Sequence, residues 1–326
     1  MLRQNKKPLG GANAADGNCS PSGNKNKGMQ AAKRNDMIFY IVMLAFPLVQ
    51  FAVMYVGVNT NVILLAFKSY DSDLKGYFWS GFVNFSQLFS EFSNSSLLKT
   101  SLINSLKVYA VQLFVSVPLC LLFSYYIFKK MAFSNFFKIF LFLPSVISSI
   151  VMTMIFKYFV ERALPEAASL FFGINMQGLL ANSKIAFGVV IFYSTWISFG
   201  VSLLMYVGGM SCIDDSVLES AQLEGVTPLQ EFFRICLPLI YPTLSTFLVV
   251  NVAQIFSNQA NVFSFFGDQA YERFYTIGYW LYVNAQRMSM TEAPKLSAMG
   301  MILTIIALPL TLLVKYLLEK FGPSEN

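Results

Sequence analysis

Three amide side chains recur within one apolar stretch of the sequence, at Asn251, Gln254 and Asn258. If that stretch is helical, the spacing i, i+3, i+7 places all three on one face of the helix. Amides both donate and accept hydrogen bonds, so such a face can bind the hydroxyl groups of a neutral sugar. The same amides can instead hydrogen-bond to neighbouring helices and only hold a bundle together. The residues alone leave both interpretations open.

A second polar feature is the segment 208–238, which separates two apolar stretches and is mainly acidic. Its only basic residue is Arg234. Its carboxylates are Asp214, Asp215, Glu219, Glu224 and Glu231. This composition suits a surface that another protein binds.

The sequence offers little for catalysis or metal binding. It contains no histidine, which removes His-based acid–base chemistry and His metal ligands. Its four cysteines, Cys19, Cys120, Cys212 and Cys236, have no metal-ligand spacing. We therefore predict no catalytic residues, no metal site and no enzymatic activity.

The composition indicates an integral membrane protein. The chain is 56% hydrophobic and only 12% charged, whereas soluble domains carry about 25% charged residues. The net charge of +6 does not indicate nucleic-acid binding, because seven basic residues lie in residues 1–36. We predict that residues 1–36 form a disordered basic tail, that residues 37–318 form the membrane domain, and that residues 319–326 form a short tail.

Six segments are long and apolar enough to cross a membrane as helices, which need about 20 residues each. The predicted spans are 37–57 (with a possible extension to 67), 105–128, 136–159, 185–207, 239–262 and 298–317. Lysines and arginines concentrate in the N-terminal tail, in the connection at 129–130 and at the C-terminal end. The positive-inside rule therefore places both termini and the segment 208–238 in the cytoplasm.

The cytoplasmic segment has the local signals of two short helices joined by a turn. Ser216 and Glu219 have the spacing of a capping box that would open the first helix. Gly225 has the position of a left-handed helix C-cap. Thr227 and Pro228 then suit the N-cap and first position of a second helix. We expect Val217, Leu218, Ala221 and Leu223 to form an apolar face on the first helix, with Ala221 allowing close approach of a partner.

The segment could instead be an interfacial helix that lies on lipid. Interfacial helices favour lysine and arginine on their polar face, and this segment is acidic. Binding to a protein is the interpretation we favour.

Residues 219–242 resemble the "EAA" loop of ABC-importer permeases. The matching residues are Glu219, Ser220, Ala221, Glu224, Gly225, Leu237 and Pro238. Ser220, Glu224 and Val226 depart from the family's usual residues but conserve size or charge. Weaker matches at 66–70, 81–85, 143–147 and Trp196–Gly200 resemble the maltose-type, carbohydrate branch of these permeases, and the resemblance covers about residues 37–318.

The resemblance implies an all-α, six-helix bundle of the type I importer permease kind in the bacterial cell membrane. It implies that the loop couples the chain to a pair of cytoplasmic ATPase subunits. Its other implied partners are a second, different permease subunit and an extracellular substrate-binding protein, besides membrane lipid. No Walker A sequence occurs, so we expect no cofactor in this chain and Mg-ATP in the ATPase subunits.

The expected function is inward movement of a sugar or oligosaccharide by alternating access, with Asn251, Gln254 and Asn258 in the substrate path. An alternative is import of another solute, such as glycerol-phosphate. A less favoured alternative is a secondary transporter that needs no ATPase. The outer loops, about 68–104, 160–184 and 263–297, are long, and the aromatic residues of the last suit either an interfacial belt or a docking surface for the binding protein.

Overall fold

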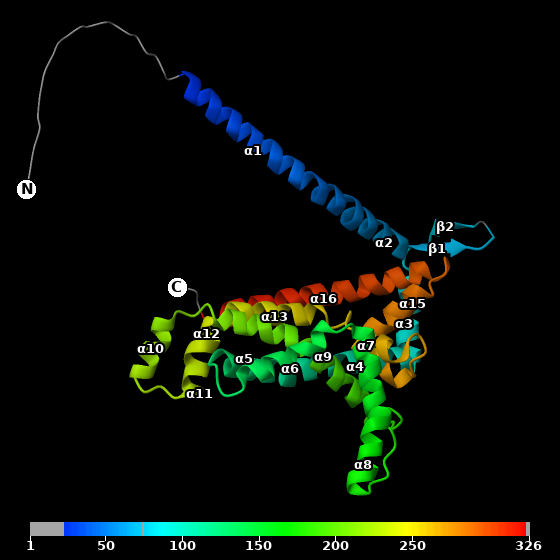
Figure 1. The fold of residues 1–326 in the computed structure, drawn as a ribbon. Helices are drawn as coiled ribbons and strands as arrows, with labels where there is room; N and C mark the ends of the chain where they lie inside the picture. The colour runs from blue at the N-terminus through cyan, green and yellow to red at the C-terminus, as the bar shows by residue number, and fades with distance from the viewer. Residues whose placement is uncertain (1–22, 74, 324–326) are drawn as a thin grey trace, which may run out of the picture. The chain divides into compact units, whose positions relative to one another are not determined.

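The structure is a computed structural model that describes residues 23–73 and 75–323, with residues 23–35 described by their backbone only (Figure 1). The chain divides into two compact units, Met1–Asn61 and Val62–Asn326. Each unit is described by itself below.

The first unit is a long apolar helix. It consists of α1 (Gly23–Gln50), a π-helical turn η1 (Phe51–Gly57) and the start of α2 (Val58–Ala66). The part Asp36–Ala66 is long and apolar enough to span a membrane. This confirms the first predicted span with its extension to residue 67, because the helix continues to Ala66.

The N-terminal boundary differs from the prediction of a disordered tail over residues 1–36. Residues 23–36 are helical, because α1 begins at Gly23. An established helix extends without a new nucleation cost, and residues 29–34 are good helix formers that precede the apolar span. The rest of the predicted tail, residues 1–22, lies outside the described residues.

The second unit opens with a small hairpin, the only sheet in the described part of the chain. Strand β1 (Lys68–Asp71) pairs antiparallel with β2 (Gly76–Trp79). Asn84 fixes the base of the hairpin, because its buried side-chain amide donates to the carbonyls of Ala66 at 2.8 Å and Lys68 at 2.7 Å. The first outer loop is therefore structured, and the fold is helical apart from this hairpin.

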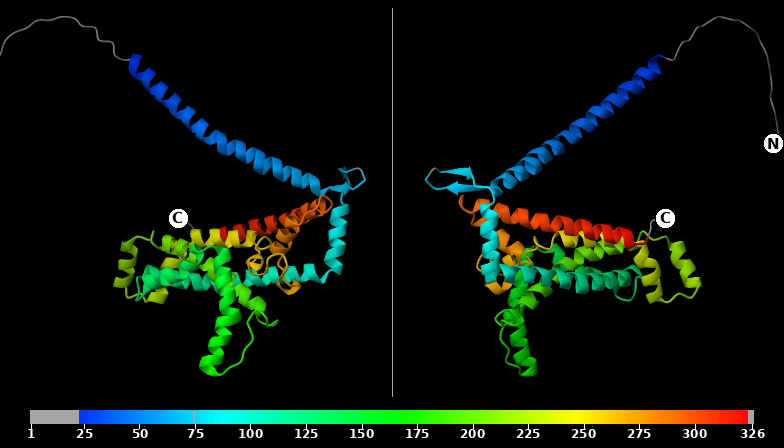
Figure 2. Two further views of the ribbon diagram at one scale, coloured as in Figure 1. Left: turned by 45° about the vertical axis from the view of Figure 1, so that its right-hand side comes forward. Right: turned by 180° about the vertical axis from the view of Figure 1, so that it is seen from behind.

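The remaining described elements are helices. In chain order they are α3 (Val83–Asn94), α4 (Ser96–Val111), η2 (Gln112–Ser116), α5 (Val117–Phe128), α6 (Ser134–Val146), α7 (Ser149–Tyr158), η3 (Phe159–Ala163), α8 (Leu164–Phe172), α9 (Ala186–Met210), α10 (Asp215–Leu223), α11 (Pro228–Glu231), η4 (Phe232–Cys236), α12 (Leu237–Leu239), α13 (Tyr241–Ala253), α14 (Val262–Phe266), η5 (Glu272–Phe274), α15 (Ile277–Gln286) and α16 (Ala293–Phe321). In the views of Figures 1 and 2, α16 lies beside α13, and α10 and α11 lie at the end of the unit where α16 finishes.

The described residues contain four single helices that can cross a membrane, or six spans if two bent helix pairs each count as one. The single spans are Asp36–Ala66, Ser96–Phe128, Ala186–Met210 and Ala293–Phe321. They confirm the predicted first, second, fourth and sixth spans, since uninterrupted apolar length is what a sequence shows best. The third and fifth predicted spans are the bent pairs.

The third predicted span, 136–159, is not one straight helix. It breaks at residues 147–148, and the helices Ser134–Val146 and Ser149–Phe172 diverge by 108°. Pro144 lies near the end of α6 and cannot donate a backbone hydrogen bond there. After it, Ile147 takes an extended conformation with ψ of 144° and stops α6.

The fifth predicted span, 239–262, is bent at its start and short at its end. Pro228–Leu239 and Tyr241–Ala253 meet at an angle of 71°. Helix α13 ends at Ala253 because the polar residues that follow form their own turns. The side chain of Asn258 accepts a hydrogen bond from the backbone of Ala260 at 2.8 Å, and Ala260 and Asn261 both have positive φ.

One close helix contact holds the bundle beside the break. Gly200 of α9 faces the end of α6, where an added Cβ would lie 2.8 Å from the Leu141 carbonyl oxygen and 2.9 Å from Phe142 Cα. Only a residue without a side chain allows this approach. The match of Gly200 to the permease pattern thus corresponds to a packing requirement.

Candidate functional site

The loop 208–238, predicted to be cytoplasmic, is built as predicted from two short helices joined by a turn. Its first helix, α10, begins at Asp215, two residues earlier than the predicted capping box would allow. Asp214 is the N-cap, and its carboxylate accepts from the backbone N–H of Ser216 at 2.9 Å. These hydrogen bonds from Ser216 lower the pKa of Asp214. The predicted Ser216–Glu219 box is wrong, because an aspartate at 214 supplies the cap first.

The turn after α10 has the geometry predicted for Gly225. Its φ is +75°, in the left-handed region. The backbone N–H of Val226 donates to the Ala221 carbonyl and that of Gly225 to the Gln222 carbonyl, each at 3.1 Å. These are the two hydrogen bonds of a Schellman motif. The bend between the two helices is therefore fixed by backbone geometry.

The second helix, α11, carries the predicted start signals. Thr227 and Gln230 form a reciprocal capping box, with Pro228 at the first helical position. The capping box and the Schellman turn together leave only Val226 between two defined helix ends. The prediction of two short helices joined by a turn, which we call the elbow, is confirmed.

The exposed face of the loop differs from the predicted one. Leu218 and Ala221 are buried within the chain itself, so Ala221 does not lie on a partner-binding surface. Its backbone carbonyl instead accepts the Val226 N–H in the Schellman turn. Leu223, at the tip, is 91% exposed.

We name a set of eight exposed residues of the loop the elbow surface. Its members are Val217, Glu219, Ser220, Leu223, Glu224, Gly225, Leu229 and Phe233. It combines carboxylates with large exposed apolar side chains. Leu237 and Pro238, the last residues of the predicted motif, are half-buried where the loop joins α13.

The sequence did not reveal how the loop is attached to the bundle. Glu231 is buried, and its carboxylate receives the ammonium group of Lys129, with Nζ at 2.9 and 3.1 Å from the two oxygens. The hydroxyl of Tyr125 donates to the Pro228 carbonyl at 3.0 Å. In the sequence, Lys129 indicates only the orientation of the spans. No local pattern links it to Glu231, 102 positions away.

The predicted substrate residues meet, although not as one helical stripe. Asn251 is on α13, Gln254 caps its end, and Asn258 lies in the following turn. The single-face interpretation is therefore wrong for Asn258. All three nevertheless line one small cavity. Residues of α4 and η2 complete its lining, which the sequence did not predict. The other lining residues are Ser105, Val108, Tyr109, Gln112 and Ile255.

This cavity is small in the structure. Its volume is about 10 Å³, which holds at most about one water molecule. No charged side chain is among its lining residues. A neutral polar solute matches its chemistry, and only an opened form has room for one.

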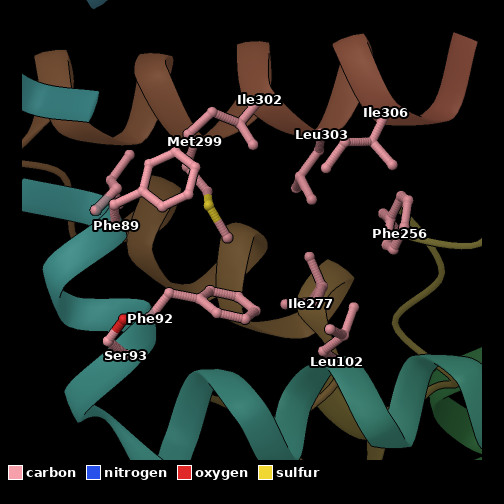
Figure 3. A pocket seen from close by; sticks show the side chains of 11 residues that line it. Phe89, Phe92, Ser93, Leu102, Phe256, Ile277, Met299, Ile302, Leu303 and Ile306 are labelled. Atoms are coloured by element: carbon pink, nitrogen blue, oxygen red, sulfur yellow. The ribbon is translucent and has the colours of Figure 1, made fainter. Parts of the chain in front are cut away.

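A larger cavity of about 410 Å³ lies between α3, α4 and α16 (Figure 3). It is lined by Leu88, Phe89, Phe92, Ser93, Leu102, Phe256, Ile277, Met299, Ile302, Leu303 and Ile306. Only Ser93 carries a polar side chain, so this cavity cannot match the hydroxyls of a sugar. Among the described residues no cluster of three or more metal-ligating side chains occurs.

The aromatic residues of the outer segment 263–297 have mostly structural positions. Phe265, Phe274 and Tyr279 are buried in a core cluster with α7 and α9. Asn104 of α4 holds the segment through hydrogen bonds to the carbonyls of Arg273 and Tyr275, each at 2.9 Å. Tyr271 and Tyr282 are exposed, and both predicted uses of these aromatics, an interfacial belt and a docking surface, stay predictions.

Comparison with known proteins supplies the family context for this geometry. Residues 116–324 match the family model described as "Binding-protein-dependent transport system inner membrane component". The chain is 26% identical over 163 residues to the Bacillus subtilis arabinooligosaccharides transport system permease protein AraP, over 49% of this chain and 52% of that protein. It is 27% identical over 125 residues to the Salmonella typhimurium maltose/maltodextrin permease MalF, over 37% and 24%.

The chain thus spans about half the length of the first of these relatives. A solved structure with the same fold is that of a bacterial ABC transporter involved in the import of the acidic polysaccharide alginate. The TM-score is 0.71 at 19% identity, over 90% of this chain and 99% of that chain.

Proposed function

Because the chain belongs to the family of binding-protein-dependent transport system inner membrane components, we propose that it is a permease subunit of an ABC importer for a sugar or oligosaccharide. The family places it in the bacterial inner membrane, in line with its four to six apolar spans. Inward movement by alternating access, driven by separate ATPase subunits, is the activity we assign.

The elbow surface is the observation that carries this proposal. An isolated loop gains nothing from exposing Leu223 at its tip, because burial of a leucine in an interface is favourable by about 1.5–3 kcal/mol. The elbow is also rigid, since both helix ends are capped by the chain itself. A rigid, acidic, apolar-tipped elbow suits docking into a cytoplasmic ATPase subunit. Glu219, Ser220, Glu224 and Gly225 are then contact residues, and Ala221, Leu237 and Pro238 maintain its shape.

The carbohydrate assignment rests on the cavity lined by Asn251, Gln254 and Asn258 and on the sugars named for the curated relatives. Uncharged amides and hydroxyls suit neutral hydroxyl groups. Glycerol-phosphate would call for cationic groups, which the lining lacks. A neutral oligosaccharide is therefore preferred over this alternative.

The small size of the cavity supports alternating access and a second permease subunit. A volume of about 10 Å³ leaves no room for a sugar, so the path must open during the cycle. A second, different permease would supply its other wall. An extracellular binding protein would deliver the sugar, and the ATPase pair would hold Mg-ATP.

Cross-linking tests the ATPase assignment. Leu223→Cys places a thiol at the tip of the elbow, and Tyr271→Cys, 67% exposed in the outer segment, is the matched control. Both are made with Cys19 and Cys212 replaced by serine, since Cys212 is exposed. We expect a thiol-reactive cross-linker in native membranes to join Leu223→Cys, and not Tyr271→Cys, to an ATP-binding protein. If neither variant is cross-linked to an ATP-binding protein, the importer assignment fails and a secondary transporter becomes the preferred function.

Uptake by right-side-out membrane vesicles tests the substrate class. Labelled maltodextrin, arabino-oligosaccharide and glycerol-3-phosphate are compared with and without ATP. We expect ATP-dependent uptake of a neutral oligosaccharide, reduced by Asn251→Leu. Thr246→Val is the control on the same helix, because the Thr246 hydroxyl bonds only to the Pro242 carbonyl. ATP-dependent uptake of glycerol-3-phosphate alone would refute the carbohydrate assignment.

A further inference from the structure

One buried ion pair connects the cytoplasmic loop to a span that the chain does not join to it. The loop continues directly into α9 before it and α13 after it. Helix α5 has no such covalent link. It reaches the loop through side chains at its C-terminal end, where Lys129 is the helix C-cap.

The contact is a compact cluster of directed interactions. Lys129 holds both carboxylate oxygens of Glu231, and the hydroxyl of Tyr125 donates to the Pro228 carbonyl. The ring of Tyr125 packs on Phe232, with ring centroids 5.1 Å apart. Helix α11 is thereby bound to α5 at both of its ends. The interaction is fixed in distance and direction, unlike apolar packing that can slide.

The pair is set apart from the other ion pairs of the described residues by its burial. The Glu231 side chain is only 4% exposed and that of Lys129 21%, whereas both members of every other pair are at least 32% exposed. Apolar residues of similar volume at such sites are often equally or more stable, because burying two charges removes them from water. Stability alone therefore does not account for a charged pair here.

The second half of the loop forms an arm, Pro228–Leu239, and this pair lies near its start, away from the bend. Pro228–Leu239 is bent by 71° from Tyr241–Ala253, and the bend lies at Ile240. An arm with a bend on one side can pivot relative to α13. A pivot at Ile240 displaces the arm, and the ion pair transfers that displacement to α5.

We propose that Lys129 and Glu231 are positioning residues that couple movement of the loop to α5. This inference rests on the proposed function, because it assumes that an ATPase moves the elbow. The loop then drives three spans, α9 and α13 through the backbone and α5 through the ion pair. Without the pair, α5 no longer follows the elbow, although the elbow still binds its partner.

The experiment measures the position of α5 in the importer purified with its ATPase subunits. Spin labels at Leu122→Cys on α5 and Leu312→Cys on α16 report the distance between these helices, since both native side chains are exposed. Cys19 and Cys212 are replaced by serine in this background. The distance distribution is recorded by pulsed electron resonance without nucleotide and with Mg-ATP and vanadate. ATP hydrolysis and maltodextrin or arabino-oligosaccharide uptake, whichever the unaltered importer transports, are measured alongside.

Three variants separate coupling from folding. Glu231→Gln breaks the pair, Lys129→Met/Glu231→Leu replaces it with apolar packing, and Lys129→Glu/Glu231→Lys reverses it. The control is Lys295→Met/Glu91→Gln, which removes the more exposed ion pair between α16 and α3. We expect the first two variants to lose the ATP-induced distance shift and about fivefold or more of the sugar moved per ATP. The reversed pair restores a substantial part of both, and the control changes neither.

The outcomes distinguish this inference from the proposed function. The inference is overturned if the apolar variant, with unaltered thermal stability, keeps both the distance shift and the sugar moved per ATP. The proposed function is overturned if the unaltered chain purifies without an ATPase or shows no ATP-dependent uptake. The inference also fails if the reversed pair is folded and stays uncoupled like Glu231→Gln.

Discussion

The contact between α9 and α6 allows a sharp prediction, because α9 supplies its own control. Gly200→Ala adds a Cβ that would lie 2.8 Å from a backbone oxygen and 2.9 Å from a backbone carbon. Neither atom can move as a flexible side chain can, so the helices must separate. Gly208→Ala, on the same helix, meets nothing within 4 Å.

The magnitude follows from two terms. Replacing glycine by alanine inside a helix is favourable by about 0.8–1 kcal/mol at either position. Forcing an extra methyl group into a packed contact costs about 1–3 kcal/mol, and only Gly200→Ala incurs it. The helix term cancels in the comparison, so Gly200→Ala is expected to be less stable than Gly208→Ala by about 1–3 kcal/mol.

The assay is the free energy of unfolding of both variants in detergent micelles titrated with SDS, followed by tryptophan fluorescence. Gly208→Ala is expected to equal or exceed the unaltered chain, and Gly200→Ala to fall below Gly208→Ala. The reasoning is refuted if the two variants agree within about 0.5 kcal/mol, the usual additivity error. Such a result would mean that α6 and α9 do not meet at Gly200.

Three further changes are expected to have defined outcomes. Gly225→Ala should strain the elbow by about 1–2 kcal/mol and lower uptake per ATP, whereas Gly225→Asn should retain more coupling; equal coupling would contradict the left-handed turn. Asn84→Leu should destabilise by about 1–3 kcal/mol, because two carbonyls lose their donor, and faster proteolysis of the hairpin is the measurement. Hydrogen bonding from Arg287 lowers the pKa of Asp268. The pair therefore stabilises the folded state above the unfolded pKa of aspartate, and this stabilisation is lost as pH falls through the lowered folded pKa. Arg287→Met should therefore lower the thermal midpoint at pH 7 and have no effect well below that folded pKa.

Local signals in the sequence predicted the elbow well. Gly225 and the Thr227–Pro228 start depend only on residues within one or two turns, and both have the expected geometry. The start at Ser216 was predicted wrongly because Asp214 offers an equally suitable cap two residues earlier. Sequence patterns rank such neighbouring caps poorly, since their strengths differ little.

Contacts between distant residues were not predictable. Apolar length located four spans correctly, but it does not give the 108° angle of the break after Pro144. The burial of Leu218 and the pairing of Lys129 with Glu231 likewise depend on how the loop folds back on α5. In one sequence these residues carry only a local pattern, which fits several tertiary arrangements.

The break in the third span has a consequence for the surrounding lipid. Helix α6 has 13 residues, which corresponds to about 20 Å of length, against a hydrocarbon thickness of about 30 Å. Short apolar segments draw the bilayer inward or require neighbours to shield the shortfall. The activity of the importer should therefore depend on acyl-chain length in reconstituted vesicles. Thinner membranes should favour the form with the broken span, so that bilayer thickness itself biases its transport cycle.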